Sequence, residues 1–76
     1  MEKEIIELIA GILEIPVEKF DIDAEMEEIE NWDSLRNVMI IASLEDEYDI
    51  SIPQDDMFDL VSARALVEEV KKLTKE

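Results

Sequence analysis

The chain has 76 residues, and its 22 acidic residues against 7 basic ones give it a formal net charge of −15. It has no histidine and no cysteine, which argues against an intrinsic hydrolase or zinc enzyme and excludes any disulfide. The length suits one domain over residues 1–76, and the charge would repel the phosphates of nucleic acids and anionic membranes.

The first segment, residues 2–14, has the pattern of an amphipathic helix. Its apolar residues recur at the spacing i, i+3, i+4 and i+7, namely Ile5, Leu8, Ile9 and Ile12. This spacing lines one helical face with apolar side chains. We expect the helix to end near Glu14, because Ile15 precedes Pro16 and is therefore disfavoured in the α region.

Residues 15–33 form a long connection to the next helix. A loop of this length is uncommon in a small domain, and it usually has a function or a local structure of its own. Its acidic residues invite comparison with a calcium-binding loop. Met26, however, stands where that loop needs its turn glycine, and Trp32 stands where it needs a bidentate glutamate. We therefore expect no specific metal site.

The second helix is predicted to begin at Asp33–Ser34 and to run to about Tyr48. Its middle, with the sequence VMIIASL, is apolar almost all round. Such a helix is either largely buried or presents an apolar face to a partner. The sequence alone leaves both alternatives open.

Two further helices are predicted after Pro53. A short helix runs from about Gln54 to Leu60, and a final amphipathic helix begins at Ser62, which is a good N-cap. The expected fold is therefore all-α, a small bundle of three main helices plus one short helix, with a long loop between the first and second helices.

The residue with the most chemical interest is Ser34, at the start of the second helix. A serine there usually caps the helix, but Asp33 can do so instead, which would leave the Ser34 hydroxyl free to face solvent. The unpaired N–H groups at a helix N-terminus also favour a phosphate group. No histidine or lysine base is evident beside Ser34, so it suits a phosphate-linked group that a separate enzyme attaches.

The stretch WDSLRNVMIIASLEDEYDISIP resembles the centre of an acyl carrier protein. Asp33–Leu35 matches the Asp-Ser-Leu motif at the start of that family's second helix, and Leu44–Tyr48 matches its Leu-Glu-acidic-acidic-aromatic run. Ile52–Pro53 matches the Ile-Pro that precedes the family's short helix. The order of helices and loop extends the resemblance over essentially the whole chain.

The resemblance implies that 4′-phosphopantetheine, transferred from coenzyme A by a separate phosphopantetheinyl transferase, is esterified to Ser34 between Asp33 and Leu35. Its thiol would carry acyl or aminoacyl chains as thioesters from a loading enzyme to downstream biosynthetic enzymes. The chain would then be a carrier and not an enzyme.

The resemblance also implies two surfaces. The positions matching the docking surface for basic patches on partner enzymes are Arg36, Met39, Glu45, Asp46 and Glu47. The positions matching the cleft for an acyl chain are Ile40, Leu44, Ile52, Met57 and Leu60. From the residues alone, the first set could equally be a solvated face and the second ordinary core.

The chain departs from the pattern of many fatty acid carriers around the serine. Ile29–Trp32 replaces their Leu-Gly-x, and Arg36 and Met39 stand where their second helix is acidic. A specialised carrier for a dedicated pathway therefore fits at least as well as a fatty acid carrier. Trp32 itself is expected to be a packing residue of the loop.

We expect a free-standing, monomeric and cytoplasmic acyl carrier for fatty acid, polyketide or related specialised biosynthesis. The N-terminus lacks the basic region of a signal peptide, and no apolar run is long enough to insert into a membrane. The alternatives are an aminoacyl or peptidyl carrier, and an acidic helical adaptor that binds its partners without modification.

Overall fold

The computed structural model, which describes residues 2–57 and 59–74, is built from helices and their connections. The α-helices are α1 (Glu2–Leu13), α2 (Ser34–Tyr48), α3 (Gln54–Met57) and α4 (Ala63–Thr74). Two 3-10 helices, η1 (Val17–Lys19) and η2 (Met26–Glu28), lie in the long connection. These residues contain no β-strand, and none of their helices is long and apolar enough to cross a membrane. The predicted all-α bundle is confirmed.

The two longer helices before α3 end in the same way. Glu14 adopts the left-handed conformation with φ of 60°, and the N–H of Ile15 donates to the carbonyl of Ala10 over 3.0 Å. Asp49 is also left-handed, with φ of 53°, and its N–H donates to the carbonyl of Glu45. A left-handed residue satisfies carbonyls that the last helical turn leaves free. The predicted ends of both helices are confirmed to within one residue.

The short helix is shorter than the sequence predicted. α3 begins after Pro53 as expected but ends at Met57 and not at Leu60. Residue 58 lies outside the described residues, and the N–H of Leu60 donates to the carbonyl of Met57 over 3.3 Å, a tight turn in place of an α-helical bond. The turn delivers the Leu60 side chain into the core, which is the physical reason that the helix does not continue.

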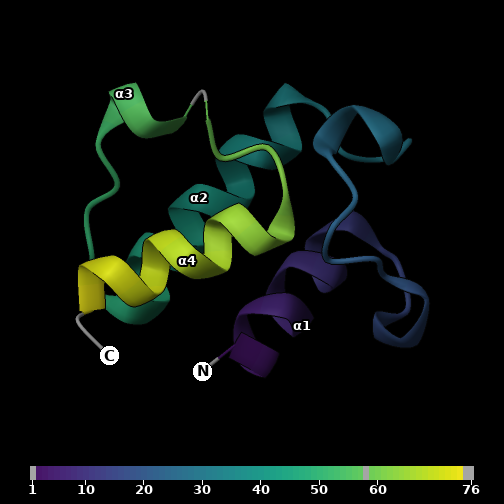
Figure 1. The fold of residues 1–76 in the computed structure, drawn as a ribbon, viewed down its shortest axis with the longest axis horizontal. Helices are drawn as coiled ribbons and strands as arrows, with labels where there is room; N and C mark the ends of the chain where they lie inside the picture. The colour runs from purple at the N-terminus through teal and green to yellow at the C-terminus, as the bar shows by residue number, and fades with distance from the viewer. Residues whose placement is uncertain (1, 58, 75–76) are drawn as a thin grey trace.

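The predicted N-cap of the last helix is confirmed. The hydroxyl of Ser62 accepts a hydrogen bond from the N–H of Ala65 over 3.2 Å, and its carbonyl accepts one from Leu66 over 3.1 Å. These bonds fix the residue at which α4 starts. In the view of Figure 1, α4 crosses in front of α2.

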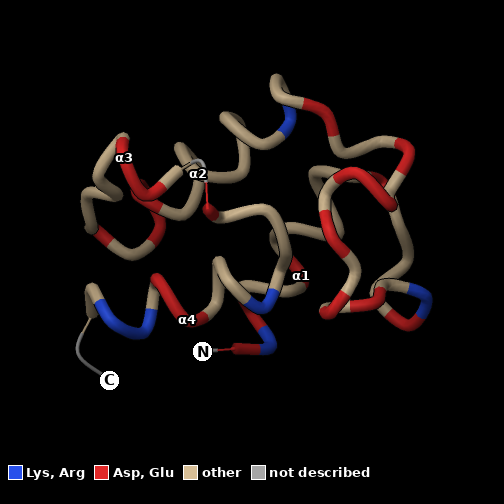
Figure 2. The backbone as a smooth tube through the Cα atoms, turned by 45° about the horizontal axis from the view of Figure 1, so that its top comes forward, with Lys and Arg blue, Asp and Glu red and all other residues tan. Residues whose placement is uncertain are grey.

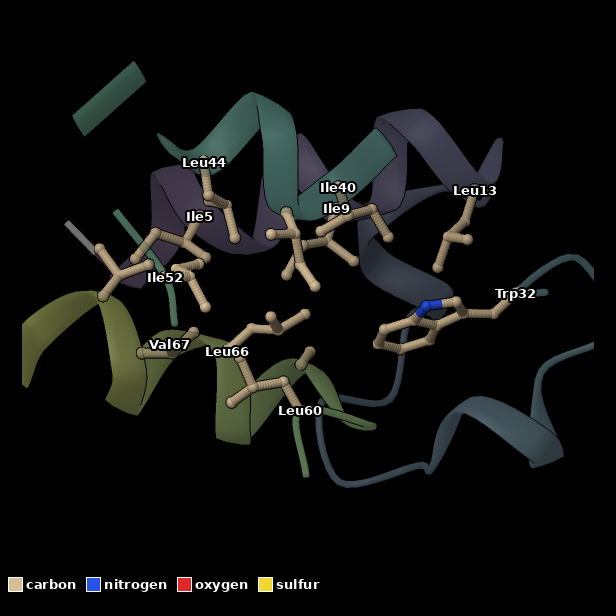
Figure 3. Close-up of a cluster of buried hydrophobic side chains, with 13 residues drawn as sticks. Ile5, Ile9, Leu13, Trp32, Ile40, Leu44, Ile52, Leu60, Leu66 and Val67 are labelled. Atoms are coloured by element: carbon tan, nitrogen blue, oxygen red, sulfur yellow. The ribbon is translucent and has the colours of Figure 1, made fainter. Parts of the chain in front are cut away.

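One apolar core lies between α1, α2 and α4 (Figure 3). Its largest fully buried side chains are Ile5, Ile9, Leu13, Ile40, Ile41, Leu44, Leu66 and Val70. They come from the periodic apolar faces of the three helices, as the spacing predicted for α1. On α2 one face is buried in this core, while Leu35, Val38 and Met39 on the same helix are exposed. That the exposed apolar residues meet a partner stays a prediction.

The long connection is attached to the start of α4 by polar contacts that we call the loop seam. The N–H of Met26 donates to the carbonyl of Val61 over 2.5 Å, and the N–H of Arg64 donates to the carbonyl of Ile22 over 3.1 Å. The guanidinium of Arg64 also pairs with the carboxylate of Asp23. With its two 3-10 helices, the connection has the local structure that its length predicted. The connection lies at the opposite end of the molecule from α3 (Figure 1).

Candidate functional site

At the start of α2, one residue caps the helix and the next residue is exposed. Asp33 is the N-cap, with φ of −106° and ψ of −177°, and its carboxylate accepts a hydrogen bond from the N–H of Arg36 over 2.8 Å. Ser34 is the first residue of α2, and its side chain is exposed. Within the described residues the Ser34 hydroxyl forms no hydrogen bond. The predicted cap is thus confirmed for Asp33, and the Ser34 hydroxyl faces solvent.

The backbone around Ser34 suits an anionic substituent. The N–H groups of Ser34 and Leu35 have no hydrogen-bond acceptor among residues 2–57 and 59–74. Free N–H groups and the helix dipole together place a partial positive charge at the N-terminus of α2. A phosphate ester on the Ser34 oxygen would lie beside these donors, so the residues present fit a phosphate-linked group.

Arg36 does not point to solvent as a free docking residue would. Its Nη1 donates to the carbonyl of Ile12 over 2.6 Å, and Asn31 donates through Nδ2 to the neighbouring carbonyl of Leu13 over 3.0 Å. Both contacts satisfy carbonyls in the last turn of α1, where a cation also suits the helix dipole. Two of the residues that depart from the fatty acid carrier pattern, Asn31 and Arg36, therefore join the segment around the start of α2 to the end of α1.

Trp32 has the packing role predicted for it. Its side chain is buried at one end of the core near Leu13 (Figure 3). The indole Nε1 donates to Oδ1 of Asn37 over 2.9 Å. This bond attaches the end of the long connection to the first turn of α2, next to Ser34.

An open groove lies beside Ser34, and we call it the Ser34 groove. Its volume is about 310 Å³. Its lining residues are Met26, Ser34, Asn37, Val38, Ile41, Gln54, Met57 and Val61. The groove therefore combines polar residues of α2 and α3 with apolar residues from η2, α2, α3 and the segment before α4.

The predicted cleft residues divide between this groove and the core. Met57 lines the Ser34 groove. The other four, Ile40, Leu44, Ile52 and Leu60, are buried in the core cluster and do not line the groove. These four occupy the place of ordinary core residues, the alternative that the sequence left open, and their role as a cleft stays a prediction.

Sequence reasoning missed most of the apolar lining of the groove. The missed residues are Met26, Val38, Ile41 and Val61. Val38 and Ile41 could have been found from the helical periodicity of α2, since both lie one turn or two beyond Ser34. Met26 and Val61 lie in segments without a regular period, and only the loop seam brings them together.

Three of the predicted docking residues are on the surface of α2. Met39 is 48% exposed, and Asp46 and Glu47 are exposed near the C-terminal end of the helix. Leu35 and Val38, at 70% and 56% exposure, extend the apolar surface around Met39. Figure 2 shows acidic positions on every helix and throughout the connection, with few basic positions among them. The exposed face of α2 is thus apolar toward its start and acidic toward its end.

Glu45 differs from its acidic neighbours on α2. Its Oε2 accepts a hydrogen bond from the N–H of Ile52 over 2.7 Å, and the residue is only half-exposed. Like Arg36, Glu45 is engaged inside the chain. The docking role of both residues stays a prediction, and the structure gives each of them a first role in holding neighbouring segments together.

Three groups away from Ser34 have shifted pKa values, and one of them is the Arg64 guanidinium, whose pKa is raised by its hydrogen bond to Asp23. The hydrogen bond from Arg64 holds the pKa of the Asp23 carboxyl below its usual range. Burial raises the pKa of the Tyr48 phenol, and the charges of Glu4 and Glu47 add to the effect. Within the described residues no group of three or more acidic side chains is arranged to hold a metal ion.

In a comparison with known protein families, the family model described as "Phosphopantetheine attachment site" matches residues 3–70. The matched region begins in α1, ends in α4 and includes the whole of α2 with the Ser34 groove. No curated protein matches the chain.

Proposed function

The chain belongs to the phosphopantetheine attachment site family, whose members carry covalently attached 4′-phosphopantetheine, and we propose that it is an acyl carrier protein modified at Ser34. The observation that carries the proposal is the exposed hydroxyl of Ser34 at the first position of α2. Asp33 already caps the helix, and the free N–H groups of Ser34 and Leu35 suit a phosphate. The motif Asp33–Leu35 supplies the attachment site.

The attachment itself needs a separate transferase, because the chain has no histidine that could activate the serine. The Ser34 oxygen forms a bond to the phosphorus next to pantetheine in coenzyme A, and the phosphoanhydride bond breaks. Adenosine 3′,5′-bisphosphate leaves, and the proton of the Ser34 hydroxyl passes to a base of the transferase. The chain contributes position, since Asp33 sets the helix start and the free N–H groups stabilise the phosphate. The bound group supplies the thiol that this chain lacks.

The Ser34 groove favours an acyl cargo over an aminoacyl or peptidyl one. Among the residues that the structure describes, the groove lining has no carboxylate that could pair with the ammonium group of an aminoacyl chain. Its apolar residues, Met26, Val38, Ile41, Met57 and Val61, match an aliphatic chain instead. We therefore assign the carrier to fatty acid, polyketide or related specialised biosynthesis, with the aminoacyl or peptidyl carrier as the alternative.

The partners would be a phosphopantetheinyl transferase, an acyl-loading enzyme and downstream enzymes that dock on α2. Asp46 and Glu47 would meet basic patches, and the charge of the whole chain would speed encounter with strong salt dependence. The apolar surface of Leu35, Val38 and Met39 would select partners with a matching apolar surface. This combination supports a specialised set of enzymes over the housekeeping fatty acid enzymes.

Intact mass after co-expression with a promiscuous phosphopantetheinyl transferase tests the attachment site. The wild-type chain should gain the mass of one phosphopantetheine group, and Ser34→Ala should gain none. Ser51→Ala removes another exposed serine, outside the groove, and should be modified like wild type. An unmodified wild type, or a modified Ser34→Ala, would contradict the proposal.

The Ser34→Ala variant should still fold, because Asp33 remains as the cap. We expect a loss of at most about 1 kcal/mol in the free energy of unfolding. Circular dichroism during urea unfolding measures it. A global loss of structure would mean that Ser34 has a structural role beyond attachment.

A further inference from the structure

A second open hollow adjoins the Ser34 groove, and we call it the Trp32 hollow. Its volume is about 330 Å³, and its lining residues are Glu25, Met26, Glu27, Trp32 and Val61. Met26 and Val61 line both spaces. These two residues are therefore common to the two spaces, and we call them the wall.

The backbone on both sides of this wall is held in place. The N–H of Met26 donates to the carbonyl of Val61 over 2.5 Å, and Glu25 forms an isolated antiparallel bridge with Ser62. The N–H of Glu25 also donates to the carboxylate of Glu28 over 2.8 Å, which closes the capping box of η2. Moving the backbone would break these hydrogen bonds. We therefore expect the wall to open by a movement of side chains, which costs less free energy.

The two wall residues differ in their freedom to move. Val61 is β-branched and has few χ1 alternatives. Met26 is half-buried and unbranched, and a methionine with three rotatable bonds adapts its shape to irregular spaces. Met26 is thus the adjustable part of the wall, and Val61 is the stiff part.

We propose that Met26 determines how long an acyl chain the protein can bury, by closing the Ser34 groove behind short chains and turning aside to admit longer ones into the Trp32 hollow. The inference rests on the function proposed above, because the occupant is the aliphatic chain tethered to Ser34. Each space alone is at the lower limit, about 300 Å³, of small-molecule sites, and the two joined are about twice as large. Residue 26 is therefore a specificity-determining position.

The rim of the Trp32 hollow restricts the far end of such a chain. Glu25 and Glu27 are both exposed there, and their carboxylates would repel a terminal carboxylate. The lining also includes Trp32, whose side chain is buried and largely apolar. A long cargo should therefore have an uncharged aliphatic end, and a dicarboxylic cargo of the same length should stop at Met26.

Trp32 makes the proposal measurable, because it is the only tryptophan of the chain and lines the second hollow. Holo protein would be prepared first and its mass verified, followed by a series of acyl forms from butanoyl to hexadecanoyl. Trp32 fluorescence and the thermal unfolding temperature would be measured for each form against the holo protein. In wild type, short chains should raise the unfolding temperature without changing Trp32 emission. Chains long enough to pass Met26 should change both.

Substitutions of Met26 should move the length at which Trp32 responds. Met26→Ala removes the three outer heavy atoms of the side chain, so the response should begin with chains shorter by about three carbons. Met26→Phe should keep the wall closed. The Trp32 emission should then stay unchanged at every chain length, and the gain in unfolding temperature should level off at a shorter chain. Val17→Ala changes an exposed apolar residue of the long connection that lines neither space, and should behave like wild type.

Val61→Ala tests the wall from its other side, and serves if a Met26 variant does not fold. It should shift the Trp32 response in the same direction as Met26→Ala, by a smaller amount. The proposal is overturned if the onset is the same in wild type and in the folded wall variants, or if no chain length raises the unfolding temperature. Failure of the proposed function would be seen earlier and separately, as a wild-type chain that gains no phosphopantetheine.

Discussion

The helical core and the long connection are held in place by different kinds of interaction. The core between α1, α2 and α4 consists of side chains that are almost fully buried and recur at helical spacing. In residues 15–33 only Trp32 is buried to that degree. The connection depends on half-buried apolar side chains that pack against this core, and in addition on the loop seam and on the hydrogen bonds of Asn31 and Trp32. The core therefore supplies stability, and the connection supplies the shape around Ser34.

This division has a consequence for a carrier of 76 residues. A domain of this size has about 4–11 kcal/mol of total stability, so a core that opened to admit cargo would put the fold at risk. A wall between the connection and the start of α4 can change with little effect on the buried core. The difference between the two regions thus suits a protein that must bind and release cargo while it stays folded.

The largest expected effect compares the same substitution in both regions. Ile9→Ala removes a fully buried side chain and should lower the free energy of unfolding by about 2–5 kcal/mol. Ile22→Ala, on a half-buried residue of the connection, should lose less than about 2 kcal/mol. Urea unfolding followed by circular dichroism measures both. Equal losses would show that the connection is as much a part of the core as α1.

A smaller effect is expected where the two regions meet at Arg36. Arg36→Gln should lower the free energy of unfolding by about 1–2 kcal/mol, since the partly buried carbonyl of Ile12 loses a charged donor. Arg64→Gln removes an exposed ion pair of the loop seam and should change stability less. If Arg36→Gln is neutral, the contact with α1 contributes nothing and Arg36 is free to act in docking alone.

This structural role also changes how a docking experiment on Arg36 must be interpreted. From the sequence, Arg36→Asp should improve docking to basic partners that resemble fatty acid enzymes. The same change places a negative charge beside the C-terminal end of α1, where the helix dipole disfavours it. Docking should therefore be compared with Met39→Asp, which adds a negative charge at an exposed position without breaking a contact to Ile12.

The smallest effects are expected in the pH dependence of stability. The helical core should lose stability at high pH, and the long connection should lose it at low pH. The raised pKa of Tyr48 contributes stability that is complete below about pH 10 and is lost as pH rises through the raised value. The lowered pKa of Asp23 contributes stability that is present above about pH 4 and is lost as pH falls through the lowered value. When the free energy of unfolding is measured against pH, Tyr48→Phe should reduce only the loss of stability at high pH. Asp23→Asn should reduce only the loss at low pH. The opposite assignment would contradict the proposed difference between the two regions.

Helix positions and the attachment motif could be predicted because they depend on neighbours in the sequence. The apolar spacing predicted α1, and Asp33 and Ser62 were recognised as caps, since a cap needs only the backbone three residues on. The short helix was predicted too long, because the turn at Leu60 depends on a core that the local sequence does not reveal. Secondary structure that relies on tertiary burial is the part that local patterns miss.

The sequence by itself determined the all-α fold, the exposed serine at a capped helix start and the membership in a carrier family, because each is expressed over a few neighbouring residues or one regular period. Only the tertiary structure decided what surrounds that serine. Arg36 reaches a carbonyl 24 residues away, and Met26 and Val61 meet across the loop seam. Contacts between segments without a common period depend on how the helices pack. For that reason the lining of the Ser34 groove emerged from the fold and not from the pattern.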